Sequence, residues 1–389
     1  MSRDKSTGFM MKTKHKIGTK LTKSAKKNFG SLILQKYEYK EILDFSHFMK
    51  KILPSGKTKK IIHNLHFDLS LNKCDILHFM NKISFSNTPW ITTFEGYLPQ
   101  CPHIRNLPFL ENAAVKRLAS KSCKKLIAFS RCSYDIECRY LENFPDYKDD
   151  IVRKICILHP PQPLIIEGYH QKKLNDQYIT FAFAGHDFVR KGGMEIVRAF
   201  DHLLQKKYPI RLFIISKLSA KQRIVLPEKT DNNEVQKFIK KYPKSVFYYN
   251  ELPYHEVLKI FKQSHVALLP TYGDTYGYSV LESQSCGCPV ITTDVRALPE
   301  TNNDNIGWMI PVPKVFGRTH ACFQTYEEKR KVSEIIKEGL IKNIEDIVSN
   351  KHIVREKGIK ALKKIRTFHN PEFRAKELEK IYDDILDNL

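Results

Sequence analysis

Short apolar runs alternate with longer stretches of helical periodicity from about residue 60 onward. Short apolar runs bounded by polar turns predict buried strands, and apolar residues that recur every three to four positions predict amphipathic helices. Their alternation is typical of βαβ units, which build mostly parallel sheets. In the front half of the chain the pattern predicts strands at 75–79, 90–94, 126–129 and 156–158, and helices at 109–122 and 130–143.

A proline-rich stretch, HPPQP at residues 159–163, interrupts this alternation and is followed by polar residues at 167–177. Prolines disfavour helix interiors and sheet ladders alike. The stretch therefore predicts a domain boundary near residue 165. Beyond it a second series begins, with predicted strands at 178–184, 211–215, 245–249, 266–269 and 289–293, and helices at 192–205, 254–263 and 278–286.

The last 60 residues have a helical pattern. Proline is favoured in the first turn of a helix, so the final helix is expected to begin at Pro371. Its apolar residues fall on one predicted stripe, which we expect to be buried: Phe373, Leu378, Ile381 and Ile385.

The charge of the chain is strongly positive. Its 65 Lys and Arg exceed the 42 Asp and Glu by 23, which indicates a polyanionic partner such as nucleic acid, an anionic bilayer or a phosphorylated small molecule. Nine of the cations lie in residues 1–30, where Asp4 is the one acidic residue. No apolar segment follows them, so this stretch is interpreted as a basic arm and not as a secretory signal.

Apolar runs and cysteines exclude other classes of protein. No apolar run approaches the roughly 18 residues that a membrane-spanning helix needs. The nine cysteines are odd in number, scattered and without a C-x-x-C pair, which indicates neither a disulfide framework nor a zinc site. We therefore expect a protein of the reducing cytoplasm.

A first chemically suggestive turn follows the predicted strand at 178–184. It runs from Gly185 to a helix start at Gly192 and Gly193, with Arg190 and Lys191 just before that start. The positive end of the helix dipole disfavours a cation there by about 0.3–1 kcal/mol, and a bound anion would reverse this penalty. Because glycines let a phosphate approach the backbone amides, the turn is interpreted as a diphosphate cradle. The alternative is a solvated basic helix start.

A second such turn follows the predicted strand at 266–269. A glycine-rich loop contains Asp274, and the next helix carries Glu282, so two carboxylates eight residues apart can flank one small polar ligand. Each has a purely structural alternative. Ser279 and Glu282 have capping-box spacing, and Asp274 can close an Asx-turn.

The residues of this second turn resemble a known signature. Residues 268–300, LLPTYGDTYGYSVLESQSCGCPVITTDVRALPE, resemble the E-x7-E motif of retaining family 4 glycosyltransferases, which is followed by small-x-Gly-x-Pro-Val-Ile. FAGHDFVRKGG at 183–193 resembles the Gly-Arg-x4-Lys-Gly diphosphate turn of that family. KLIAFSRCSYDI at 125–136, followed by ICILHPPQP at 155–163, resembles the end of its N-terminal domain.

The resemblance implies an α/β protein of GT-B fold. Two Rossmann-like parallel-sheet domains would face each other across a cleft, and the C-terminal helix would cross back to the first domain. The chain would then divide into a basic arm at 1–30, an N-terminal acceptor-side domain at 31–165, a C-terminal nucleotide-sugar-binding domain at 166–370, and a returning helix at 371–389.

The resemblance also implies an activity. It is that of a retaining, metal-independent hexosyltransferase that moves a sugar from a UDP- or GDP-sugar to a hydroxyl of a glycan or lipid-linked acceptor, in polysaccharide or glycolipid biosynthesis. No cofactor is implied beyond the donor. The sequence contains no D-x-D spacing, which argues against a metal-bridged diphosphate.

Site residues carry over by position. Glu282 matches the glutamate that binds the donor ribose, and Lys191 matches the phosphate-binding lysine. Asp274 stands at the first glutamate of the motif, near the donor sugar, and with Lys191 is the catalytic candidate. Glu95 is the acceptor-side candidate. The remaining donor-binding candidates are Gly185, His186, Arg190, Tyr276, Gly277, Tyr278 and Ser279.

The basic residues of segment 109–125 suggest where the enzyme acts. They accompany Phe109, Leu110, Val115 and Leu118, which suits a helix lying on anionic lipid. We therefore expect a cytoplasmic protein that is peripheral on the inner face of a membrane. A solvated basic helix face is the alternative.

Two other functions compete with this interpretation. A nucleic-acid-binding protein would fit the positive charge, but no RNA-binding, helix-turn-helix or zinc pattern supports it, and we expect no nucleic-acid partner. Another GT-B enzyme, such as a nucleotide-sugar epimerase or a phosphorylase, would share the fold. The donor turn with its acidic pair favours transfer.

Overall fold

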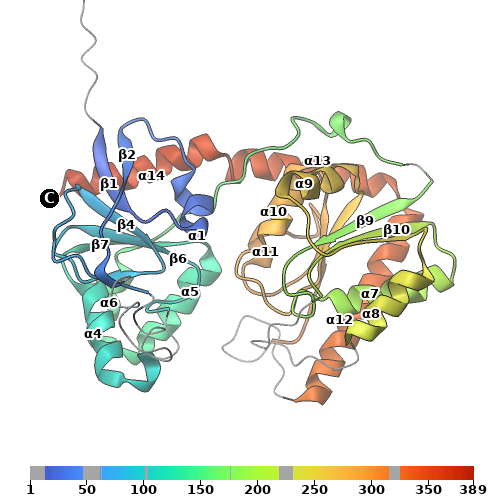
Figure 1. The fold of residues 1–389 in the computed structure, drawn as a ribbon, viewed down its shortest axis with the longest axis horizontal. Coiled ribbons are helices and arrows are strands. Elements are labelled where there is room, and N and C mark those ends of the chain that lie inside the picture. The colour runs from blue at the N-terminus through green and yellow to red at the C-terminus, as the bar shows by residue number, and fades with distance from the viewer. Residues whose placement is uncertain are drawn as a thin grey trace, which may run out of the picture. The chain divides into compact units, whose positions relative to one another are not determined.

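The structure is a computed structural model that describes residues 14–46, 62, 64–100, 104–175, 177–218, 231–314 and 325–389. Two compact units make up the chain (Figure 1). Unit 1 comprises Met1–Ala128, Ile136–Pro160 and Glu372–Leu389, and unit 2 comprises Phe129–Asp135 and Pro161–Pro371. Each unit contains its own six-stranded sheet, and every pairing in both sheets is parallel. The predicted α/β architecture with two parallel sheets is therefore confirmed.

The sheet of unit 1 has the strand order β2-β1-β4-β6-β7-β8, and a separate two-stranded sheet pairs β3 with β5. The strands are β1 (His15–Thr19), β2 (Tyr37–Glu41), β3 (Leu65–His66), β4 (Ile76–Met80), β5 (Ile83–Ser84), β6 (Trp90–Phe94), β7 (Cys123–Ala128) and β8 (Ile155–Ile157). The helices are α1 (Lys23–Ala25), the π-helical turn Lys26–Gly30, the 3-10 turns Ile104–Asn106 and Leu141–Asn143, α4 (Pro108–Ala119), α5 (Arg131–Tyr140), α6 (Pro145–Val152) and α14 (Pro371–Leu386).

Residues 14–30, which the sequence assigned to a basic arm, belong instead to the folded part of unit 1. β1 lies inside the sheet between β2 and β4. Ile17, Ala25 and Phe29 are buried in the core of the unit. The many lysines around them are compatible with this, because an ammonium on a long stem reaches solvent from a buried backbone. Residues 1–13 lie outside the described residues.

Helix α14 packs into the core of unit 1, although it follows unit 2 in the chain (Figure 1). Leu378 and Ile385 of the predicted stripe are buried there, and Ile381 is partly buried against the same core. Tyr382, which was not predicted, is buried with them. The phenol of Tyr382 lies 2.7 Å from Nδ1 of His78, and burial lowers the pKa of this histidine to about 3. Phe373 was assigned to the buried stripe wrongly. It is 49% exposed, in the first turn of the helix.

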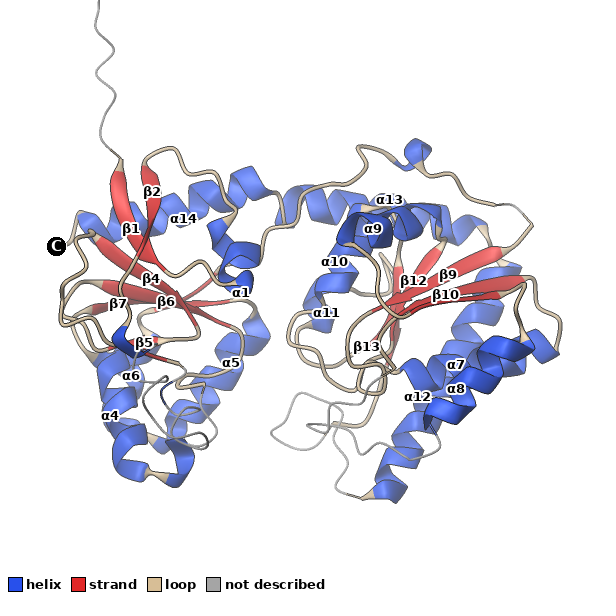
Figure 2. Ribbon diagram, viewed as in Figure 1, coloured by secondary structure: helices blue, strands red, loops and turns tan. Residues whose placement is uncertain are grey.

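The sheet of unit 2 has the order β11-β10-β9-β12-β13-β14. Figure 2 shows α7, α8 and α12 on one face of this sheet and α9, α10 and α13 on the other. The strands are β9 (Ile179–Ala184), β10 (Ile210–Ile215), β11 (Val246–Tyr249), β12 (Val266–Leu269), β13 (Val290–Thr293) and β14 (Trp308–Ile310). The helices are the 3-10 turn Tyr169–Gln171, α7 (Gly193–Gln205), α8 (Asp231–Lys241), α9 (Tyr254–Gln263), α10 (Tyr278–Ser285), α11 (Leu298–Thr301), α12 (Tyr326–Ser349) and α13 (His352–Phe368).

None of the helices in the described ranges is both long enough and apolar enough to cross a bilayer.

Candidate functional site

The direction of the strand order reverses between β9 and β12 in unit 2. From β9 the sheet proceeds through β10 to β11 on one side, and from β12 through β13 to β14 on the other. Doubly wound sheets bind ligands at such a switch point, at the carboxyl ends of the strands. β9 ends at Ala184 and β12 at Leu269, so the two turns singled out in the sequence lie next to each other at this point.

The two turns approach each other backbone to backbone. Gly192 has φ +79°, and a Cβ atom on it would lie 2.1 Å from the carbonyl oxygen of Pro270. No other residue type fits this contact, because the backbone atom cannot move aside. The amide of Tyr272 donates to the carbonyl of Arg190 at 2.9 Å, and the hydroxyl of Thr271 donates to the same oxygen at 3.1 Å. The turn after β9 is therefore fixed against the loop after β12.

Two helices begin at this site without a side-chain cap. The N-cap residues are Gly192 for α7 and Gly277 for α10, and both are left-handed glycines. A glycine supplies no capping oxygen, so the first-turn amides of both helices lack a side-chain cap. Such helix N-termini attract anions through their amides and dipoles.

The capping-box interpretation of Ser279 and Glu282 is wrong. Ser279 is the second residue of α10 and not its N-cap, which is Gly277. Its hydroxyl is buried and has no hydrogen-bond partner among the described residues. The Ser279 hydroxyl therefore does not cap the N-terminus of α10.

Lys191 and Asp274, 83 residues apart in the sequence, form an ion pair. The Lys191 ammonium lies 3.2 Å from Oδ2 of Asp274, and the two side chains are 15% and 13% exposed. Burial acts to raise the pKa of Asp274, but the charges of Lys191 and Arg190 outweigh burial and hold that pKa below its usual value. Asp274 also accepts the amide of Gly277 at 3.1 Å. This bond goes three residues along the chain and not the two of the expected Asx-turn, and it holds the loop before α10.

Arg190, the second cation of the turn, is paired as well. Its Nε atom donates to Oδ2 of Asp187 at 2.8 Å, and its guanidinium donates to the carbonyl of Gly273. Both cations of the predicted diphosphate cradle thus contact carboxylates within unit 2. An incoming diphosphate would compete with Asp187 and Asp274 for them.

The other predicted donor-site residues have varied environments. A Cβ atom on Gly185 would lie 2.6 Å from Cδ of Lys191, so a glycine makes room there for the lysine stem. His186 is exposed. Tyr276 is buried, with Tyr278 beside it at 6.1 Å between ring centroids. Glu282 is half-buried on α10, and its charge adds to burial in raising the pKa of Tyr254 to about 12.

Glu95, the acceptor-side candidate, lies in unit 1 directly after β6. Its backbone amide donates to the Asn81 side chain at 3.2 Å, and its carboxylate accepts the Asn81 amide group at 3.3 Å. Asn81 directly follows β4, the neighbour of β6. These reciprocal bonds fix Glu95 at the carboxyl edge of the sheet of unit 1.

Sequence reasoning missed three residues of the donor turns: Asp187, Glu195 and Tyr272. Asp187 has φ +67° and pairs with Arg190. Glu195 is 2% exposed and accepts the phenol of Tyr272 at 2.6 Å. One signal was available for Glu195, since it stands among the apolar residues Met194, Ile196 and Val197, all of which are buried.

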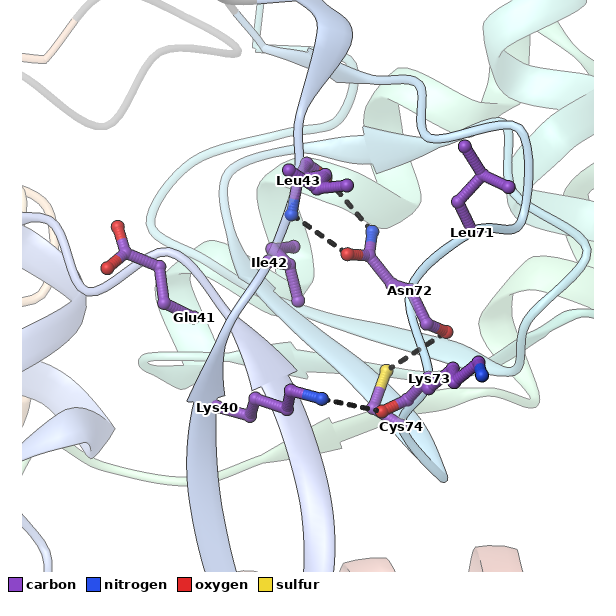
Figure 3. Close-up of a pocket in the computed structure, with 8 residues that line it drawn as sticks. All are labelled: Lys40, Glu41, Ile42, Leu43, Leu71, Asn72, Lys73 and Cys74. Atoms are coloured by element: carbon purple, nitrogen blue, oxygen red, sulfur yellow. Dashed lines mark hydrogen bonds between the residues drawn. The ribbon is translucent and has the colours of Figure 1, made fainter.

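Unit 1 has a cavity of about 510 Å³, and none of the predicted site residues lines it. Figure 3 shows its lining residues. Asn72 accepts the amide of Leu43 at 2.8 Å and donates to its carbonyl at 3.0 Å (Figure 3). Burial raises the pKa of the Cys74 thiol to about 11, so this thiol is protonated near neutral pH. We assign no chemistry to this cavity. It is lined by Lys40, Glu41, Ile42, Leu43, Leu71, Asn72, Lys73 and Cys74.

A family model matches a large part of unit 2. Residues 166–321 match the family model described as Glycosyl transferases group 1. That span contains both of the turns singled out in the sequence, at 183–193 and 268–282. The capsular polysaccharide biosynthesis glycosyltransferase CapM of Staphylococcus aureus is 27% identical over 148 residues, which are 37% of this chain. The matched region spans 35% of the length of CapM.

Solved structures resemble the whole chain. A glycosyltransferase from Rickettsia africae has a TM-score of 0.57 at 15% identity, with 91% of this chain and 86% of that one covered. HepE from Anabaena, solved in complex with UDP, has a TM-score of 0.55 at 10% identity, with 90% and 86% covered. The chain has the GT-B fold.

Proposed function

We propose that this protein is a retaining, metal-independent glycosyltransferase. It moves a sugar from a nucleotide-sugar donor to a hydroxyl of a glycan or glycolipid acceptor. The observation that carries the proposal is the meeting of two uncapped helix N-termini and Lys191 at the switch point of unit 2, within the span that matches group 1 glycosyltransferases. The UDP in the structure of HepE supports a nucleoside diphosphate as the leaving group.

In this proposal the donor diphosphate binds at the starts of α7 and α10. Lys191 and Arg190 are drawn from their carboxylate partners to the phosphate oxygens, with Gly185 and His186 lining the turn. Positive charge there stabilises the leaving diphosphate, which is where negative charge develops in the transition state. A retaining transfer of this kind needs mainly such stabilisation and a positioned acceptor.

The sugar and ribose would lie along α10. Glu282 binds the ribose, and the amides from Tyr276 to Ser279 line the sugar and diphosphate. Asp274, once Lys191 has moved to the phosphates, faces the sugar and balances the positive charge that develops at its anomeric carbon. Glu95 of unit 1 is the candidate contact for the acceptor.

A panel of UDP-, GDP-, ADP- and CDP-sugars, scored by thermal shift, tests the proposal. At least one should raise the melting temperature, and an oligonucleotide should not. Proton NMR of the product, run with and without a metal chelator, then tests the chemistry: the product should keep the anomeric configuration of the donor in both runs. Stabilisation by the oligonucleotide alone, an inverted anomer, or activity lost to the chelator contradicts the proposal.

Glu282→Gln should weaken nucleotide-sugar binding by about 1–3 kcal/mol, because a charge-assisted hydrogen bond to the ribose becomes a neutral one. Without ligand the melting temperature should hardly change. Isothermal titration of the donor measures the effect. Glu256→Gln, on the neighbouring helix α9, is the matched control and should bind as the wild type does. If Glu282→Gln lowers stability and leaves binding intact, Glu282 has a structural role only.

Association with an anionic membrane is part of the proposal, and the burial of α4 restricts which of its side chains are available for contact with lipid. Val115 and Leu118 of α4 are buried in unit 1 and cannot face lipid. The exposed apolar residues lie at the beginning of the helix, where Phe109 is 83% exposed and Leu107 and Leu110 are about half as exposed. An amphipathic helix start with cations nearby, such as Lys116, suits an anionic surface.

Phe109→Ser should lower the binding constant for anionic vesicles about tenfold or more in a cosedimentation titration, because an inserted aromatic ring contributes about 1.5–3 kcal/mol of apolar burial. Binding should also fall as salt is raised, since the nearby lysines act through screened charge. Ile33→Ser is the matched control, as Ile33 is 82% exposed and lies outside α4. Equal binding to neutral and anionic vesicles, or equal losses in both variants, contradicts the membrane proposal.

A further inference from the structure

A carboxylate is buried beside the diphosphate turn without a charged partner among the described residues bonded to it. Glu195 lies in the first turn of α7 and is 2% exposed. Its Oε1 atom accepts two hydroxyls, from Tyr272 at 2.6 Å and from Ser333 at 2.6 Å. Its Oε2 atom has no hydrogen-bond partner within the described part of the chain. Burial raises the pKa of Glu195 above its usual value.

The stability of unit 2 alone does not account for a glutamate at this position. An apolar residue of similar size at this buried position would avoid the cost of burying a carboxyl group whose second oxygen lacks a partner among the described residues. What the carboxylate adds is direction, because short O–H···O bonds to a carboxylate hold their donors in one geometry. The hydrogen bonds of Glu195 therefore orient the groups that donate them.

Tyr272 is held at both of its ends by the segment that carries Lys191. Its amide donates to the carbonyl of Arg190 at 2.9 Å, and its phenol donates to Glu195. The tyrosine is fully buried and stands two residues before Asp274. The Glu195–Tyr272 bond thus connects the first turn of α7 to the loop that brings Asp274 within 3.2 Å of Lys191.

We propose that Glu195 is a positioning residue of the donor site. Through the Tyr272 phenol it fixes the loop at 271–274 against the diphosphate turn, so that Asp274 and Lys191 stand where the donor needs them. The inference rests on the proposed function. Ser333, on α12, makes the second bond to the same oxygen, and its hydroxyl also interacts with the Tyr272 phenol. The Glu195–Tyr272 bond does not pass through Ser333, so it remains when the Ser333 hydroxyl is removed.

The pair Tyr272→Phe and Ser333→Ala tests the proposal. Each removes one hydroxyl from the same carboxylate oxygen at the same 2.6 Å, so their costs in melting temperature should be similar. Tyr272→Phe should lower kcat/KM for the nucleotide-sugar about tenfold or more, the usual size for losing a charged hydrogen bond that orients a site. Ser333→Ala should leave kcat/KM within about twofold of the wild type.

Two variants of Glu195 complete the experiment. Glu195→Gln keeps an acceptor oxygen and should retain most of kcat/KM, whereas Glu195→Leu should lose as much as Tyr272→Phe. The double variant Glu195→Leu with Tyr272→Phe should lose no more than either single variant, because both remove one bond. Donor titrations of each folded variant show whether the loss is in binding or in turnover.

The outcomes separate the two claims. Equal losses of kcat/KM in Tyr272→Phe and Ser333→Ala, or no loss in either, overturn the positioning role while the wild type remains a working glycosyltransferase. A wild type that neither binds nor turns over any of the four nucleotide-sugars overturns the proposed function, and the positioning role with it.

Discussion

Lys191→Ala is expected to lower kcat/KM for the nucleotide-sugar by about 100-fold or more, the size seen when one preorganised donor to a developing anion is lost. In the proposed mechanism the Lys191 ammonium neutralises much of the negative charge that develops on the leaving diphosphate. It does so at the point where α7 and α10 both begin. The variant should also melt at a lower temperature without ligand. It leaves Asp274, 13% exposed, without its lysine partner, and an uncompensated buried charge is destabilising.

Steady-state kinetics and a melting curve of the same preparation measure both effects. Lys206→Ala is the matched control, because Lys206 is exposed at the other end of α7. It removes the same charge just beyond the opposite end of α7, and it should leave kcat/KM unchanged and the melting temperature nearly so. A Lys191→Ala protein that is destabilised but retains normal kcat/KM would mean that the lysine serves Asp274 alone.

Asp274→Asn should reduce turnover far more than donor affinity. The carboxylate is proposed to balance positive charge at the anomeric carbon, an interaction that strengthens mainly in the transition state. The ion pair adds a second expectation. Asp274 competes with phosphate for Lys191, so its neutralisation should leave nucleoside diphosphate affinity unchanged or higher. Asp274→Glu, which restores a carboxylate on a longer stem, should be tolerated or activating.

Titrations with a nucleoside diphosphate, compared with kcat for each variant, check this prediction. Asp187→Asn is the comparison variant. It removes the carboxylate partner of Arg190, as Asp274→Asn removes that of Lys191. It should change diphosphate affinity with little effect on kcat. If Asp274→Asn weakens diphosphate binding and lowers kcat in proportion, the carboxylate acts by closing the loop at Gly277 and not at the sugar.

Local patterns in the sequence determined much of unit 2. The helix predicted at 254–263 and the strand predicted at 266–269 are α9 and β12 to the residue. An amphipathic period and a short apolar run each indicate which residues face the protein interior. Both patterns can be recognised from the residues of a single helix or strand. The position of both donor turns follows for the same reason. A strand, glycines and a helix start are consecutive in each turn, so their order in the chain already places the turn at the carboxyl edge of a sheet.

Tertiary structure decided which groups meet. The sequence did not reveal β1, because this strand lies in a lysine-rich stretch. Composition gives the charge of such a short segment but does not show that its backbone pairs within a sheet. The pairing of Lys191 with Asp274 and of Glu195 with Tyr272 joins residues 83 and 77 positions apart. No periodicity encodes such contacts, because they depend on the order of β9 and β12 in the sheet and on Gly192 letting two backbones touch. Sequence alone therefore indicated a cationic turn and an acidic loop. The tertiary structure brings the two together in one largely buried cluster, in which their charges neutralise each other.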